Sequence, residues 1–191
     1  FAIIRAGYRG SSSGSLVVDP YFEQNIKGAA DNGIDVGIYF FTQALDEREA
    51  VEEASIVLSL IKGHKITYPV FIDSEGAGGN GRADNLDVPT RSKVCQAFCE
   101  TIRSGGYTAG IYASKNWLNN RLDITKFSGD NVIWLAEYTD ADKPTYGGTY
   151  GLWQYTSSGR LNGIEGRVDF NLCFWNFGDE EEERNNDEWE N

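Results

Sequence analysis

The segment Tyr68-Pro69-Val70-Phe71-Ile72-Asp73-Ser74-Glu75 is an apolar run that ends in two acids separated by one residue. Alternate side chains of a strand share a face, so Asp73 and Glu75 should project together from the strand's carboxyl end. Crowded and partly buried carboxylates repel, and one of the pair is then expected to hold its proton near neutral pH. This arrangement indicates acid/base hydrolysis, above all of glycosidic bonds. A strand that simply ends in a polar loop is the alternative reading.

Strands and helices alternate on both sides of this segment. Apolar runs predict further strands, and stripes of apolar residues at helical spacing predict helices between them. The predicted strands are 1–6, 36–41 and 109–113, and the predicted helices are 21–32, 46–62 and one that begins near Pro89 and ends at Gly105. Such alternation requires a parallel sheet wrapped by helices, so the fold class is α/β.

The pattern changes after Ser114. Three more strands are predicted at 132–138, 148–156 and 167–175, joined by short links rich in Gly, Asp, Pro and Ser. Short links favour antiparallel neighbours. The whole sequence therefore predicts an irregular TIM-like β/α barrel, with regular parallel β/α units first and antiparallel, helix-poor strands at the carboxyl-terminal end.

Length and charge favour one domain with a terminal extension. The chain has 191 residues and 40% apolar content, enough for a sizeable core. Its net charge of −12 is concentrated in residues 178–191, where eight acids accompany one arginine. We expect residues 1–177 to form the barrel domain and residues 178–191 an acidic tail or linker. The acidic balance argues against nucleic acid as a partner, and no stretch is long and apolar enough for a membrane span.

The cysteines and the single histidine offer little chemistry. Cys95 and Cys99 share a helical face with apolar residues, which favours small buried side chains over a disulfide or metal pair. His64 stands in a Lys-Gly-His-Lys link and lacks the partners of a zinc site. A Ser-His-Asp triad would have to use the same histidine, and no nucleophile turn such as G-x-S-x-G accompanies it. These residues therefore favour neither a zinc site nor such a triad.

Several strings taken together resemble a known family. "IIRAGYRG", "DPYFEQNIKGA" with "VGIYFF", "YPVFIDSE", "AGIYAS" with "NWLNN", "WLAEY" and "YGLWQYTSSGRLNGIEGRVDFN" stand in the order and at the separations found in the glycoside hydrolase family 25 lysozymes. The resemblance covers about residues 1–177. It implies hydrolysis of the β-1,4 bond between N-acetylmuramic acid and N-acetylglucosamine in bacterial peptidoglycan, on an irregular β/α barrel without metal or cofactor. It also implies an extracellular or cell-wall location; we expect a monomer.

Carried over by motif, the resemblance assigns Glu75 as general acid/base, Asp73 as the assisting carboxylate and Asp169 as a third acid. It implies a sugar-contacting wall of Tyr39, Tyr112, Trp134, Trp153 and Gln154. Aromatic rings and amides suit sugars, whose C–H faces rest on rings while their hydroxyls need hydrogen-bond partners. Tyr39 and Tyr112 could instead be ordinary core aromatics, although the site is the favoured interpretation. Glu137 could be a surface residue as easily as a site residue. The charge of Arg5 could pair with a site carboxylate or, equally, form an ion pair at the bottom of the barrel.

One departure from the family pattern concerns the start of the chain. Family members begin with a strand and helix before the "IIRAG" strand, and that first strand ends in an active-site aspartate. We expect this strand to lie upstream in the natural protein; without it, activity would be in doubt. Two other functions stay open. A chitinase-like barrel would carry a further acid where Phe71 stands, and a catalytically impaired peptidoglycan-binding domain would keep the cleft without cleavage.

Overall fold

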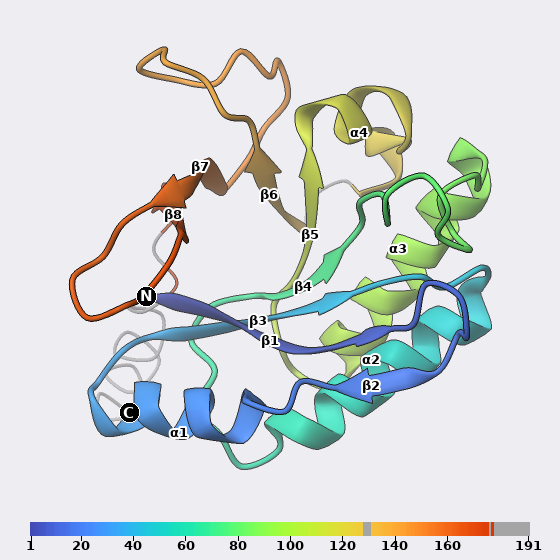
Figure 1. Cartoon of the computed structure of the whole chain (residues 1–191). Coiled ribbons are helices and arrows are strands. Elements are labelled where there is room, and N and C mark those ends of the chain that lie inside the picture. Colours follow the sequence, from blue (N-terminus) through green and yellow to red (C-terminus); the bar gives the residue numbers. More distant parts are fainter. Residues whose placement is uncertain (128–130, 176, 178–191) are drawn as a thin grey trace, which may run out of the picture.

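The computed structural model describes residues 1–127, 131–175 and 177, and the acidic tail expected at 178–191 lies outside them. The described chain forms one curled eight-stranded sheet in the order β2-β1-β3-β4-β5-β6-β7-β8 (Figure 1). The strands are β1 (Ala2–Arg9), β2 (Leu16–Val18), β3 (Val36–Phe41), β4 (Val70–Asp73), β5 (Ala109–Ser114), β6 (Asn131–Ala136), β7 (Leu152–Gly159) and β8 (Val168–Cys173). The helices are α1 (Phe22–Asp31), α2 (Glu47–Ile61), α3 (Val88–Ser104), α4 (Lys115–Asn120) and the 3-10 helix η1 (Ile124–Phe127).

Local sequence signals set the ends of the two longest helices. The carboxylate of Asp46 accepts a hydrogen bond of 2.9 Å from the backbone N–H of Glu49, and Asp87 caps α3 in the same way through Thr90. Such caps satisfy backbone donors that the first helical turn leaves unpaired. Gly63 and Gly106, with φ of 88° and 87°, follow the helix ends in the left-handed conformation that glycine adopts without strain. These signals explain why the sequence predicts α2 and α3 nearly to the residue.

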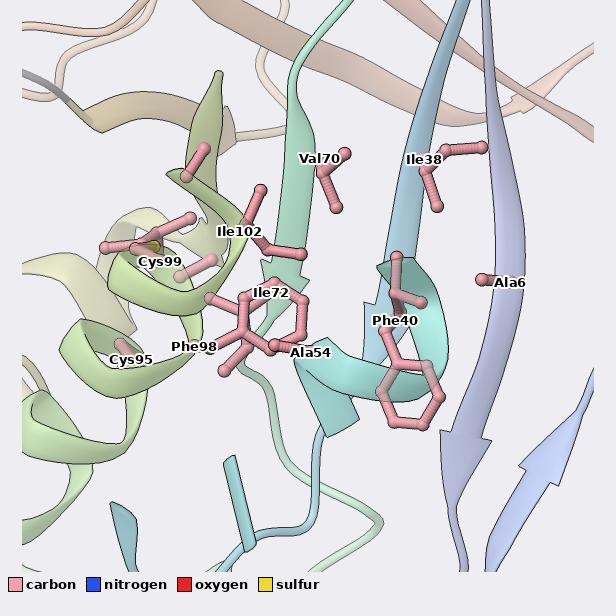
Figure 2. Packing of buried hydrophobic residues seen from close by; sticks show 14 of the residues in the cluster. Ala6, Ile38, Phe40, Ala54, Val70, Ile72, Cys95, Phe98, Cys99 and Ile102 are labelled. Carbon is pink, nitrogen blue, oxygen red and sulfur yellow. The ribbon is translucent and has the colours of Figure 1, made fainter. Parts of the chain in front are cut away.

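The main core lies between the sheet and the helices. The outward side chains of β1, β3, β4 and β5 pack against α1, α2 and α3 in one buried cluster. Figure 2 shows its centre, where Ile72 of β4 and Phe40 of β3 meet Ala54 of α2 and Phe98 of α3. Each fully buried side chain of the size of isoleucine or phenylalanine contributes about 1.5–3 kcal/mol to the stability of the fold. The cluster therefore fixes the first half of the sheet as a rigid support.

Alternate residues of the same strands point to the opposite, inner face. A second cluster of buried apolar residues lies there, built around Phe71, Tyr112 and Trp134. Phe71 occupies the space beside Gly110, since a Cβ at Gly110 would stand 2.4 Å from the Phe71 ring and 2.5 Å from the carbonyl oxygen of Val132. The inner face thus has an apolar floor low on the strands, and polar groups begin only at their carboxyl ends.

The carboxyl-terminal strands correct one prediction. β1, β3, β4, β5 and β6 are parallel neighbours, as predicted for the first units, and β7 pairs with β8 in antiparallel fashion. However, β6 and β7 are parallel, so the prediction of antiparallel neighbours throughout this part is wrong. The link 137–151 is long enough to carry the chain back without a helix. The short strand β2, antiparallel to β1, is a second feature that the sequence analysis did not predict.

The structure also bears on two smaller predictions, which concern the cysteines and membrane-spanning helices. Cys95 and Cys99 are free and fully buried in the apolar core, which confirms their interpretation as small apolar residues. Burial raises the pKa of the Cys95 thiol to about 12. Among the described residues, no helix combines the length and apolar character that crossing a membrane demands.

Candidate active site

The two acids of the D-x-E segment stand where β4 leaves the middle of the sheet. Asp73 shares the inner face with Phe71, and its row in the sheet register continues through Tyr112 and Trp134. The backbone here is held from both sides, because Thr42 N–H donates to the Asp73 carbonyl oxygen at 3.0 Å and Ser74 N–H donates to that of Tyr112 at 2.9 Å. The acids are therefore attached to a backbone that both neighbouring strands keep in place.

Asp73, Glu75 and Asp169 all line one groove of about 1060 Å³, which we call the carboxylate groove. Asp73 is buried, with a relative exposure of 6%, whereas Glu75 and Asp169 are exposed to the groove. Asp169 comes from β8, far from β4 in sequence and in strand order. The fold thus brings together the three acids that the sequence singles out.

The environment favours the protonated forms of all three acids. Burial, and then the charge of Glu75, raises the pKa of Asp73 well above its usual value, against the opposing charge of Arg5. Burial and the charge of Asp169 raise the pKa of Glu75, and burial raises that of Asp169. Asp73 Oδ1 is buried without a hydrogen-bond partner among the described residues, as expected of an acid whose charge is poorly compensated. Interacting carboxyls of this kind titrate as a group.

Aromatic rings form the floor of the carboxylate groove. Trp134 is its centre: the ring of Tyr112 lies 4.6 Å away, that of Phe71 5.1 Å and that of Tyr39 6.3 Å, measured between centroids. The indole Nε1–H of Trp134 donates a 2.8 Å hydrogen bond to Asn171 Oδ1, which fixes the ring's orientation. Tyr39, Tyr112 and Trp134 all line the groove, where the sequence analysis expected a sugar-contacting wall.

Gln154, the third residue of β7, also lines the carboxylate groove. Its side-chain oxygen accepts two hydrogen bonds, from the hydroxyls of Tyr112 at 2.8 Å and Tyr138 at 2.6 Å. Both acceptor positions of this oxygen are then filled, and the amide N–H₂ group is left to donate to a ligand.

Trp153 is the one expected wall residue that the structure does not bring to the carboxylate groove. As the neighbour of Gln154 in β7 it points to the opposite face, where it is buried in the main core. Its indole N–H donates to the carbonyl oxygen of Glu137 at 2.8 Å. In this position Trp153 supports the sheet from behind.

Glu137 has a structural role in the link 137–151. Its carboxylate accepts hydrogen bonds from Lys115 Nζ, from the Thr145 hydroxyl and from the backbone N–H groups of Thr145 and Tyr146, at 2.5–3.1 Å. Burial opposes the charge, but these donors prevail and lower the pKa of Glu137. The link is therefore tied down at the strand end from which it departs.

Arg5 answers a question that the sequence analysis left open. Its guanidinium Nε lies 2.6 Å from the buried carboxylate of Asp19 and remains 48% exposed. The charge of Arg5 also favours the ionised form of Asp73, and so opposes the increase in the pKa of that carboxyl. Arg5 thus forms an ion pair with Asp19 and also acts electrostatically on Asp73.

Sequence reasoning missed most of the second wall of the carboxylate groove. This wall includes Tyr155, Leu161, Ile164, Arg167 and Phe170, from the β7–β8 hairpin and its link 160–167. The available signal was the presence of Leu161 and Ile164, two large apolar residues, in a link otherwise rich in Gly and charged residues.

A groove that joins clustered carboxylates to an aromatic floor, at the carboxyl ends of parallel strands, is typical of glycoside hydrolases. The sequence model described as "Glycosyl hydrolases family 25" matches residues 4–164. The chain belongs to this family.

Three relatives illustrate the similarity. The chain is 27% identical over 173 residues to the uncharacterized protein YegX of Escherichia coli O157:H7, covering 90% of this chain and 58% of that protein. It is 26% identical over 162 residues to the autolytic lysozyme of Clostridium acetobutylicum, covering 85% of this chain and 46% of the relative. The modular autolysin LytC of Streptococcus pneumoniae, solved with a synthetic peptidoglycan ligand, superimposes with a TM-score of 0.76 at 30% identity, over 88% of this chain and 39% of LytC. The chain thus spans about half of the curated relatives' length.

Proposed function

We propose that this protein is a peptidoglycan hydrolase, a lysozyme that cleaves the β-1,4 bond between N-acetylmuramic acid and N-acetylglucosamine. The observation that carries the proposal is the carboxylate groove, in which Asp73, Glu75 and Asp169 face an aromatic floor. Family membership and the similarity to an autolytic lysozyme and to LytC support the same activity. Cell-wall glycan strands are then the substrate, and the cell wall or the extracellular space is the place of action.

Glu75 acts as the general acid. Asp73 and Glu75 interact, and burial and the repulsion of neighbouring carboxylates raise the pKa of both, so the pair keeps a proton to a higher pH than free carboxylic acids do. Glu75 is the member of the pair that is exposed to the groove, so it can protonate the departing glycosidic oxygen. Asp73 and Asp169 stabilise the positive charge that develops at the sugar's anomeric carbon.

The floor of the carboxylate groove positions the glycan. Tyr39, Tyr112 and Trp134 offer ring faces and edges to the C–H faces of the sugars. The amide N–H₂ of Gln154 donates to a hydroxyl or N-acetyl oxygen. These contacts orient the glycan beside the acids.

Further parts of the proposal concern the whole protein. The curled sheet corresponds to most of an irregular TIM-like barrel, with residues 1–177 as the catalytic domain and the acidic residues 178–191 as a tail or linker. The enzyme works as a monomer. Size-exclusion chromatography with light scattering tests the last point, and a stable dimer would contradict it.

Purified cell walls provide the decisive assay. The wild-type protein should clear a wall suspension and release new reducing ends, whereas Glu75→Gln should lower the rate by about a hundredfold or more. Glu165→Gln is the matched control, because Glu165 is exposed in the link 160–167 and does not line the groove. Wall binding without release of reducing ends by the wild type would instead support a catalytically impaired binding domain.

A further inference from the structure

The link 160–167 presents two large apolar side chains to the carboxylate groove. Leu161 and Ile164 are 50% and 53% exposed, and both line the groove. Ile164 N–H donates to the Leu161 carbonyl oxygen at 3.1 Å, and Gly163 between them has a φ of 92°. This is the pattern of a tight turn that needs glycine at its third position. The turn holds both side chains beside the groove, where they are not needed for the core.

Arg167 follows in the same link and is the only cationic side chain among the groove-lining residues that the structure describes. Within the described part of the chain it forms no ion pair. It stands two residues before Asp169, and both line the groove. The other charged side chains of the groove are Asp73, Glu75 and Asp169, which repel anions.

Arg167 is exposed to the groove and has no ion-pair partner among the described residues, so its guanidinium can bind a ligand group of opposite charge. The sugar rings of peptidoglycan are uncharged, but the lactyl group of each muramic acid carries a peptide stem with free carboxylates and alanine methyl groups. A guanidinium binds a carboxylate through two parallel hydrogen bonds. Leucine and isoleucine contact methyl groups of a ligand without any polar requirement.

We propose that the three groove-lining residues of the link 160–167 form a subsite for the peptide stem of the substrate, in which Arg167 binds a stem carboxylate while Leu161 and Ile164 contact its apolar side chains. This inference rests on the proposed function and adds to it a preference for glycan strands that still carry their stems. The aromatic floor binds the sugars, and the side chains of the link bind the peptide stem that is attached to them.

A pair of substrates tests the subsite. Soluble glycan fragments are prepared with stems, and a second portion is stripped of stems by an amidase. Arg167→Gln should lower kcat/KM about tenfold or more on the first substrate, the usual effect of losing a charge-assisted hydrogen bond. It should leave kcat/KM on the stripped substrate unchanged. Arg160→Gln is the matched control, since Arg160 is exposed in the same link but does not line the groove.

Each other outcome has a definite meaning. An equal loss on both substrates would overturn the proposal and assign Arg167 to the field of Asp169. No loss on either substrate would place the stem elsewhere. The double variant Leu161→Ser/Ile164→Ser should reproduce the selective loss, and an unselective loss would contradict the apolar half of the proposal.

A binding measurement separates this inference from the proposed function. Calorimetry with the Glu75→Gln protein compares a disaccharide that carries a tetrapeptide stem with the bare disaccharide. The stem should tighten binding about fivefold or more, and adding Arg167→Gln should remove that gain. Equal affinities would overturn the subsite even in an active enzyme. Stem-dependent binding by a wild type that cleaves neither substrate would uphold the subsite and refute the hydrolase.

Discussion

The hydroxyl of Tyr112 donates a 2.8 Å hydrogen bond to the side-chain oxygen of Gln154, joining β5 to β7 across the intervening strand β6. Trp134 of that intervening strand packs against Tyr112, with 4.6 Å between the two ring centroids. A second hydroxyl, from Tyr138, reaches the same oxygen. The orientation of the Gln154 amide is therefore determined by two tyrosines, which hold its N–H₂ group ready for a ligand.

Removing the Tyr112 hydroxyl tests this arrangement. Tyr112→Phe should raise KM for glycan fragments about threefold to tenfold, because one of two groups that orient the amide is lost, and should cost about 1 kcal/mol of stability. Tyr146→Phe is the control, since Tyr146 is also buried but lies outside the groove. Steady-state kinetics on both variants provide the comparison. An unchanged KM for Tyr112→Phe would show that Gln154 does not need this bond.

The raised pKa of Asp73 predicts how stability depends on pH. A carboxyl whose pKa is higher in the folded state contributes stability that is present at low pH and lost as the pH rises through the folded pKa. Asp73→Asn removes this loss. The variant should be more stable than the wild type at pH 8, by about 0.5–2 kcal/mol, and the difference should shrink towards pH 3. Thermal unfolding across this range measures it, and a variant less stable at pH 8 would refute the prediction.

Neighbouring tryptophans on opposite faces of the sheet should separate binding from stability. Trp134→Phe removes ring surface and an indole N–H from the carboxylate groove, so KM should rise about fivefold or more. Trp153→Phe removes a buried hydrogen bond to Glu137 behind the sheet and should lower stability by about 1–2 kcal/mol with little change in kinetics. Exchange of these two outcomes would mean that Trp153 contacts the sugar after all.

Two glycines provide a test of the inner face. A Cβ at Gly110 would lie 2.4 Å from the Phe71 ring, so Gly110→Ala should destabilise the fold by about 1–3 kcal/mol. Gly28 lies within α1 with no atom in reach of an added Cβ, so Gly28→Ala should stabilise by about 0.5–1 kcal/mol. Chemical denaturation of both variants is sufficient. A tolerated Gly110→Ala would show that the floor can yield to make room.

The sequence predicts the first half of the fold well because each element carries its own signal. Asp46 and Asp87 cap helices, glycines end them, and the apolar runs of β3 and β4 are unmistakable. The sequence does not predict which strands pair with one another after Ser114. β7 lies parallel to β6 because the link 137–151, tied by Glu137, returns the chain to the other end of the sheet, and no local pattern encodes that return.

The candidate site divides in the same way. Asp73 and Glu75 are visible in one segment, and period-2 alternation places them correctly. Trp153 and Gln154 are adjacent in sequence, so only one of them can face the groove, and their residue types alone do not decide which. Arg167 was missed because an arginine before a strand has no distinctive pattern. Arg167 becomes a candidate for ligand binding only because the fold places it in a groove lined by acids.

The hydrogen bonds from Thr42 and Ser74 give the two sides of the cleft unequal freedom. Asp73 ends and Glu75 follows a strand that pairs with neighbours on both sides, whereas Asp169 lies on β8, which among the described residues pairs only with β7. The side of the groove that carries Asp73 and Glu75 is therefore held more firmly than the side that carries Asp169. Any adjustment to wider or narrower ligands therefore falls to the hairpin, and sequence change there can retune what is accepted without moving the proton donor.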